Sequence, residues 1–170
     1  MKEQRRSQSE GAKAFSNRWI DDNYTIIGKG HYYKGDFVMA EEVFKYMQRK
    51  HKEPDSQVAA GAWLARTYMA LENMPKANSA LLKAVGERDA SDELRADAFL
   101  VQAEFLLTQN NFEEAMASIE RAIPLIKKKR DRARPLFVLA QLKQRYGRNQ
   151  QAIDLFEDVV KLRTPYEMEF

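Results

Sequence analysis

The sequence predicts an all-α fold, an α-solenoid of four helix–turn–helix repeats with a period of 37 to 38 residues. Two series of small residues, each with separations of 37, 38 and 37 positions, carry this prediction: Ala40, Ala77, Ala115, Ala152 and Gly28, Ala65, Ala103, Ala140. The 170-residue chain also has only seven Gly and five Pro, too few for the many turns of a β-rich fold. Because a repeated period of this length is typical of helical arrays, the two series predict four stacked helix pairs.

A large apolar residue follows each alanine of the first series by about one helical turn: Phe44, Leu81, Ile119 and Phe156. The small residue lets two helix backbones approach, and the large residue fills the adjoining hole. We therefore expect the eight small residues to be the packing positions of the repeats. A single helix pair buries too little surface to be stable alone, so stability is expected to come from stacking.

The expected repeat domain covers residues 19–165. A polar, partly disordered lead-in is expected at 1–18, and 166–170 is expected to be the tail of a longer protein. The four repeats are expected at about residues 21–54, 57–89, 93–130 and 133–164.

The first repeat is expected to contain helices at about 22–34 and 37–50. Asp21-Asp22-Asn23 can cap the first of them. Gly35-Asp36 is expected to end that helix and cap the next, and Pro54-Asp55-Ser56 to end the repeat.

The second repeat is expected to contain helices at about 57–71 and 74–85, joined by the turn Glu72-Asn73. Pro75 falls in the first turn of the second helix, where the missing N–H costs nothing. The segment 89–92 contains the next cap.

The third repeat is expected to contain helices at about 93–108 and from Phe112 onward. Pro124 falls inside what would be the last turns of the second helix. Since proline removes a backbone hydrogen bond and clashes one turn back, we expect a kink or an end there. The fourth repeat is expected to contain helices at about 133–146 and 150–162, separated by Gly147.

Composition excludes several classes of protein. With 44% apolar and 31% charged residues the chain suits a folded soluble protein, and a net charge of +3 says little about partners. The absence of Cys excludes disulfides, thiolate zinc sites and cysteine nucleophiles. No apolar run approaches the ~20 residues of a membrane span, and no signal peptide is expected in this chain.

These features resemble the tetratricopeptide repeat over about residues 20 to 165. The matching positions are Tyr24, Ile27, Gly28, Gly35-Asp36-Phe37, Ala40, Phe44, Leu64, Ala65, Tyr68, Ala77, Ala84, Phe112, Ala115 and Ala122. Two departures are Glu72-Asn73 in place of a turn glycine and Lys143 in place of an aromatic residue. The resemblance implies a solenoid that binds protein partners in a concave groove lined by the first helix of each pair.

The chain also resembles, more narrowly, the PorW/SprE-type lipoproteins of the Bacteroidota type IX secretion system. The matching segments are residues 29–33, 63–68, 125–134, 139–142 and 164–170. This resemblance implies a periplasmic scaffold, anchored to the outer membrane, that links a PorN/GldN-type ring component to translocon subunits and supports gliding motility in some members. The lipid-bearing Cys of that family is absent here, so membrane attachment is expected only through an anchor that this chain lacks.

The expected partner-binding groove is defined by outward side chains of the first helices: Lys29, Tyr32, Tyr33, Trp63, Arg66, Met69, Glu104, Phe137, Gln141 and Arg145. Aromatic and Arg side chains are typical hot spots of protein interfaces. Trp63 and Phe137 have a second interpretation, which is packing between neighbouring first helices. The carboxylate clamp of chaperone-binding repeats is absent, since several of its places are occupied by Thr25, Trp63, Asp97 and Val101. A peptide C-terminus is therefore not the expected ligand.

A basic cluster lies between the third and fourth repeats: Lys127, Lys128, Lys129, Arg130, Arg132 and Arg134. It is interpreted either as a solvated loop or as a patch that docks a partner. Nucleic-acid binding would need a wider basic face with aromatic platforms.

No catalytic or metal-binding constellation is expected. His31 and His51 lack ligand spacing, and His31 falls on the packing face of its helix. Gly28-Lys29-Gly30 lacks the spacing of a phosphate-binding loop. Glu41-Glu42 and Glu113-Glu114 are adjacent acids in first turns, where they complement the helix dipole and do not face one another.

The sequence therefore predicts a non-enzymatic protein–protein interaction scaffold with no cofactor and no small-molecule substrate. Three hypotheses remain open at this point. They are a periplasmic scaffold of the type IX secretion system, a cytosolic adaptor without a carboxylate clamp, and a nucleic-acid-binding helical repeat.

Overall fold

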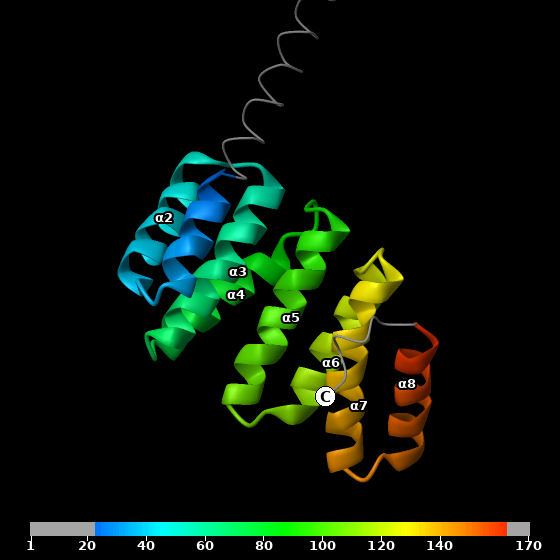
Figure 1. The fold of residues 1–170 in the computed structure, drawn as a ribbon. Helices are drawn as coiled ribbons and strands as arrows, with labels where there is room; N and C mark the ends of the chain where they lie inside the picture. The colour runs from blue at the N-terminus through cyan, green and yellow to red at the C-terminus, as the bar shows by residue number, and fades with distance from the viewer. Residues whose placement is uncertain (1–22, 163–170) are drawn as a thin grey trace, which may run out of the picture.

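The computed structural model describes residues 23–162, and all regular structure in this range is helical. A helix at 23–33 pairs with α2 (Phe37–Lys50). The next pairs are α3 (Pro54–Ala70) with α4 (Met74–Gly86), α5 (Asp92–Thr108) with α6 (Phe112–Ala122), and α7 (Ala133–Arg145) with α8 (Asn149–Lys161). Short 3₁₀ helices, η1 (Ile123–Leu125) and η2 (Lys129–Arg132), connect α6 to α7. Figure 1 shows the pairs stacked in chain order, which confirms the predicted solenoid.

The helix boundaries near Pro54 and Pro124 can be compared with those predicted from the sequence. Pro54 is the first residue of α3, so the prediction that it ends the first repeat and that the helix starts at about 57 was wrong. The fixed φ of proline suits the first helical position, where no intrahelical N–H bond is lost. Pro124 behaves as predicted, because α6 ends at Ala122 and the chain continues as η1. The expected lead-in, the tail at 166–170 and Thr164-Pro165 lie outside the described residues.

The eight small residues of the two periodic series are all buried. Gly28 shows why a small residue is needed, since a Cβ atom there would lie 2.4 Å from Cζ of Phe44. Phe44 itself is completely buried and belongs to the core shared by the first two pairs. A second core joins α5, α6 and α7 around Ile119 and Leu139.

The turn inside each helix pair contains one residue with a left-handed backbone, and these residues follow the same period. They are Gly35 (φ 78°), Glu72 (φ 56°), Asn110 (φ 57°) and Gly147 (φ 71°). The turn geometry is thus kept at Glu72, where the sequence lacks glycine. A residue with a Cβ atom pays a steric cost in this region, and Glu has no short side chain that compensates locally as Asn does.

Glu72→Gly is therefore expected to raise the free energy of unfolding by about 0.5–1 kcal/mol, since glycine adopts this backbone freely. Urea denaturation followed by circular dichroism measures the change. Gly147→Ala provides the matched control in the fourth pair and is expected to lower stability by a similar amount. Equal stability of Glu72→Gly and the wild type would show that the turn relaxes without cost.

A polar contact joins α2 to α3 beside the first core. Lys45 Nζ lies 2.5 Å from Glu41 Oε1, and the Tyr68 hydroxyl donates to the same oxygen at 3.1 Å. The hydrogen bond from Lys45, assisted by that from Tyr68, lowers the pKa of the Glu41 carboxyl below its ordinary value. The ionised form of Glu41 is consequently the one that stabilises the fold.

This pKa shift predicts a pH-dependent contribution to stability. The contribution of Glu41 is fully present above the ordinary Glu pKa of about 4.3, and it is lost as the pH falls through the folded-state pKa. Glu41→Gln is expected to lower the free energy of unfolding at neutral pH and to differ little from the wild type at about pH 2. Urea titrations of both proteins at the two pH values test this. A difference in unfolding free energy between Glu41→Gln and the wild type that stays the same in acid would contradict the role assigned to Glu41.

Candidate functional site

The side of the array formed by residues 23–33, α3, α5 and α7, here called the first-helix face, contains a dense aromatic cluster around Trp63. The Trp63 ring stacks on Phe44 of α2 with centroids 6.0 Å apart, and the rings of Tyr32 and Tyr33 lie at 5.5 and 6.0 Å. Trp63 is only 7% exposed. Of the two interpretations of Trp63, the structure favours packing over an outward side chain, because side chains of three helices converge on its ring and exclude solvent.

Two cations cover the Trp63 ring. Lys29 Nζ lies 4.9 Å from the ring centroid, and Arg66 Cζ lies 4.7 Å from it. Contacts of this kind contribute about 0.5–2 kcal/mol, with the upper end reached when the cation is desolvated. The cluster therefore fixes Lys29 and Arg66 on the first-helix face.

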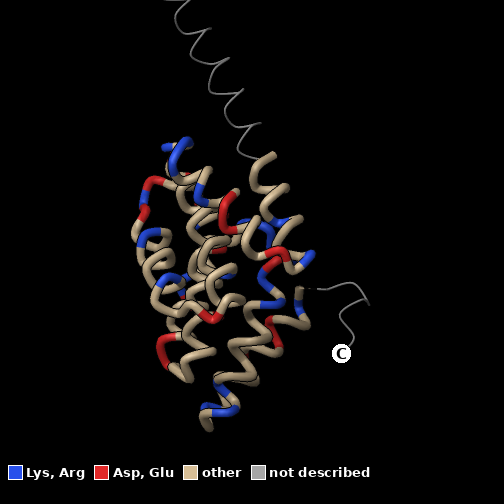
Figure 2. The backbone as a smooth tube through the Cα atoms, turned by 90° about the vertical axis from the view of Figure 1, so that its left-hand side faces the viewer, with Lys and Arg blue, Asp and Glu red and all other residues tan. Residues whose placement is uncertain are grey.

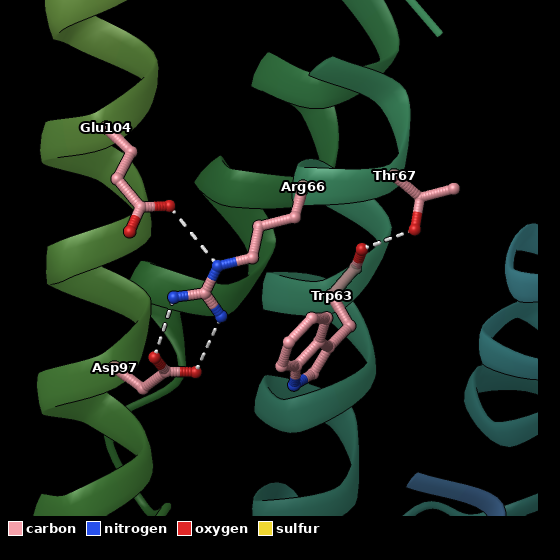
Figure 3. A network of polar contacts seen from close by, with 5 residues as sticks. All are labelled: Trp63, Arg66, Thr67, Asp97 and Glu104. Carbon is pink, nitrogen blue, oxygen red and sulfur yellow. Dashed lines mark hydrogen bonds and ion pairs between the residues drawn. The ribbon is translucent and has the colours of Figure 1, made fainter. Parts of the chain in front are cut away.

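Arg66 also connects α3 to α5 through two carboxylates (Figure 3). Its Nη1 and Nη2 donate to Asp97 at 3.3 and 3.0 Å, and its Nε donates to Glu104 at 3.2 Å. Burial alone would lower the pKa of Arg66, but Asp97 and Glu104 outweigh it and raise the pKa above the ordinary value. The guanidinium is therefore charged and held in one orientation between the second and third pairs.

A cleft of about 310 Å³ lies between α5 and α7 beside this network. Its apolar wall includes Leu100 and Leu107 of α5 and Val138 of α7, and Ile119 of α6 also contributes to its lining. Arg134 also lines the cleft and has no ion-pair partner among residues 23–162. The cleft thus combines apolar surface with the paired Arg66 and Glu104 and with one cation, Arg134, that has no ion-pair partner in the described range.

A second hollow of about 470 Å³ continues along α7 and shares Val138 with the cleft. Gln141, Gln144 and Arg145 contribute its polar groups. Because residues 134, 138, 141 and 145 are spaced by four, three and four positions, they form one stripe of α7. We call the cleft and this hollow together the α5–α7 groove.

The ten predicted groove residues separate into three groups. Arg66, Glu104, Gln141 and Arg145 line the α5–α7 groove. Around Trp63 and its core lie Lys29, Tyr32, Tyr33 and Met69, of which Tyr33 is 75% exposed. Phe137 packs on Phe156 of α8 with ring centroids 5.5 Å apart, so it contributes to packing within the fourth pair.

Sequence reasoning missed the apolar lining of the cleft. Leu100 and Leu107 alternate with Asp97 and Glu104 at steps of three and four residues on α5. That spacing is the signal of one helix face and could have revealed them.

The six residues of the basic cluster between α6 and α7 differ in their contacts. Arg132 folds back, with Nε donating to the Ile126 carbonyl at 2.7 Å. Lys127 Nζ lies 3.9 Å from Asp92 Oδ2. Arg134 contributes to the lining of the cleft. Lys128, Lys129, Arg130 and Arg134 are exposed and have no ion-pair partner among the described residues. The basic patch therefore stays a prediction, in which Arg132 is held back by its bond to Ile126.

Charges of both signs are interspersed over the described helices (Figure 2). A nucleic-acid-binding surface would instead concentrate Lys and Arg on one face. Within residues 23–162, no group of three or more His, Cys, Asp or Glu side chains could hold a metal ion. The same residues include no helix long and apolar enough to cross a membrane.

Four stacked helix pairs and a lined groove on the first-helix face define an α-solenoid, a class of protein that presents extended surfaces to partners. Residues 96–128, in the third pair, match the family model of the tetratricopeptide repeat. A search of curated proteins finds no match to this chain.

Solved structures of this fold resemble the chain over most of its length. MamA is 23% identical, with 81% of this chain and 74% of that chain covered and a TM-score of 0.61. Pseudomonas aeruginosa pilF is 21% identical, covers 84% of this chain and 61% of its own, and has a TM-score of 0.69. A signal transduction ATPase with a tetratricopeptide repeat sensor from Pyrococcus horikoshii is 20% identical, with coverages of 86% and 24% and a TM-score of 0.74. These likenesses show that the chain has the fold of tetratricopeptide-repeat proteins.

Proposed function

We propose that this chain is a non-enzymatic scaffold that binds a segment of a partner protein in the α5–α7 groove. The observation that carries the proposal is the lining of that groove. Leu100, Leu107 and Val138 offer apolar contact, while Arg134 and Arg145 have no carboxylate partner among the described residues. Interfaces typically combine a desolvated apolar centre with Arg at its edge.

We further propose that the partner belongs to the type IX secretion system and that the full-length protein works in the periplasm, anchored to the outer membrane. The support is the resemblance of residues 125–134 and 164–170 to PorW/SprE-type lipoproteins. The implied partners are a PorN/GldN-type ring component and translocon subunits of the outer membrane. A cytosolic adaptor is the competing function.

A binding experiment with purified components tests both levels of the proposal. The immobilised chain is expected to retain the ring component, and Arg134→Glu/Arg145→Glu is expected to reduce binding by about tenfold, because repulsion replaces two attractions. Arg121→Glu/Lys161→Glu makes the same change of charge at exposed positions of α6 and α8 and is expected to bind like the wild type.

The outcomes separate the two levels. If the chain retained the ring component and both double variants weakened that binding equally, the groove assignment would be overturned. If a cytosolic partner were retained through the groove, or if the native protein fractionated with the cytosol, the secretion role would be wrong and the scaffold would stand. A signal peptide followed by Cys at the start of the full-length gene product is the expected sequence context.

A further inference from the structure

A third hollow lies away from the α5–α7 groove, where the C-terminal ends of α2 and α4 meet the first turn of α3. Its volume is about 450 Å³. Four of its lining residues are basic: Lys45, Arg49, Lys52 and Lys83. Glu87 is the one carboxylate among them. None of these residues lines the α5–α7 groove, so the two sites are separate surfaces.

The positive charges of this hollow are only partly neutralised. Lys45 pairs with Glu41, as described above. Lys52 donates from Nζ to the Gln48 carbonyl at 2.9 Å, which leaves its charge without a carboxylate. Arg49 and Lys83 have no ion pair or hydrogen bond from their side chains to any residue in the described range. Three cations therefore share one hollow without carboxylate partners.

Helix ends explain part of this arrangement. Arg49 lies in the last turn of α2 and Lys83 in the last turn of α4, where the helix dipole favours cations. A helix terminus supplies only about half an elementary charge, which falls off within one turn. Three cations without carboxylate partners line the hollow against one carboxylate, Glu87, and the two helix termini. The potential of the hollow therefore stays positive and can be satisfied by an anion.

The wall of the hollow is held in place by its amide side chains. Gln57, in the first turn of α3, donates from Nε2 to the Gln48 carbonyl at 3.1 Å and also to the His51 carbonyl. These bonds hold the end of α2 against the start of α3. The cations thus project from a fixed frame, which lowers the cost of ordering them around a ligand.

We propose that this hollow, the α2–α4 pocket, docks an acidic segment of a partner protein, whose carboxylates meet Arg49, Lys52 and Lys83. The guanidinium of Arg49 suits bidentate carboxylate contact, and the two ammonium groups donate in less directional contacts. The site adds a second attachment point to the proposed scaffold. Two separate contacts on one array raise the overall affinity for a partner that reaches both.

Fluorescence anisotropy with a labelled peptide of alternating Glu and Asp tests the proposal on the intact chain. The wild type is expected to bind this peptide, to bind it less as salt is raised, and to ignore the corresponding Gln/Asn peptide. Arg49→Gln/Lys83→Gln is expected to weaken binding by about fivefold, because two exposed ion pairs are lost. Lys128→Gln/Lys129→Gln removes the same net charge elsewhere and is expected to change binding little.

Two further measurements test whether the weakened peptide binding arises at the α2–α4 pocket. Circular dichroism melting establishes that both double variants remain folded. In NMR titrations the side-chain amide signals of Gln48 and Gln57 are expected to shift on adding the acidic peptide. Failure to bind, equal weakening in the two double variants, or unshifted Gln48 and Gln57 signals would overturn the proposal. Arg134→Glu/Arg145→Glu is expected to bind this peptide normally, so either site can fail without the other.

Discussion

Phe44→Ala is expected to lower the free energy of unfolding by about 3–5 kcal/mol, the range typical of a large aromatic removed from a packed core. Phe44 is completely buried, stacks on Trp63 and lies in the space that a side chain at position 28 would need. Its removal leaves a cavity that Gly28 cannot fill. Since the free energy of unfolding of a folded domain is typically only about 5–15 kcal/mol, this single substitution removes a large part of the stability.

Urea denaturation followed by circular dichroism measures the loss, and hydrogen exchange locates it. The amides of residues 24–33 are expected to exchange faster in Phe44→Ala, because that helix packs on Phe44 through Gly28. Val38→Ala is the matched control on α2, where the side chain is 66% exposed, and it is expected to change stability by less than about 0.5 kcal/mol. If Phe44→Ala lowered the free energy of unfolding as little as Val38→Ala does, the first pair would contribute little to the stability of the array.

The repeat architecture could be predicted because helix crossings constrain residue size directly. Only a small residue fits where two backbones approach, so Gly28 and Ala40 mark crossings whatever surrounds them. The same period recurs in the left-handed turn residues, including Glu72, whose identity gives no hint of that geometry. Helix pairing was therefore visible in the sequence, whereas the strained backbone at Glu72 required the structure.

The exposure of side chains was harder to predict, since it depends on how neighbouring helices are rotated. Trp63 is buried because Tyr32, Tyr33 and Phe44, all distant in sequence, converge on its ring. Phe137 turns toward α8 because Phe156 lies opposite it. Neither environment follows from the spacing of residues within one helix.

The link between α3 and α5 was accessible from the sequence in retrospect. Arg66 and Glu104 each follow one residue of the periodic small series, Ala65 and Ala103, and are separated by one period of 38 residues. Equivalent positions of adjacent repeats lie side by side in a solenoid, so opposite charges at this position predict an ion pair. The bidentate contribution of Asp97 does not follow from the period and depends on the rotation of α5.

Arg66→Met is expected to lower the free energy of unfolding by about 2 kcal/mol, because a bidentate ion pair and a second charge-assisted hydrogen bond disappear together. Methionine keeps an apolar side chain against Trp63, so the loss reports mainly on charge. The effect stays below that of a fully buried ion pair because the side chains of Asp97 and Glu104 are 36% and 53% exposed and regain water.

A double-mutant cycle with Asp97→Asn measures the part of this loss that belongs to the pair. The coupling free energy between Arg66 and Asp97 is expected to be about 1–2 kcal/mol, and that between Arg66 and Glu104 smaller, since Glu104 receives one bond and is more exposed. Additive effects at Arg66 and Asp97 would show that the contact does not join the second and third pairs. Because Arg66 and Glu104 also line the α5–α7 groove, a measured coupling implies that partner binding there depends on the same contact.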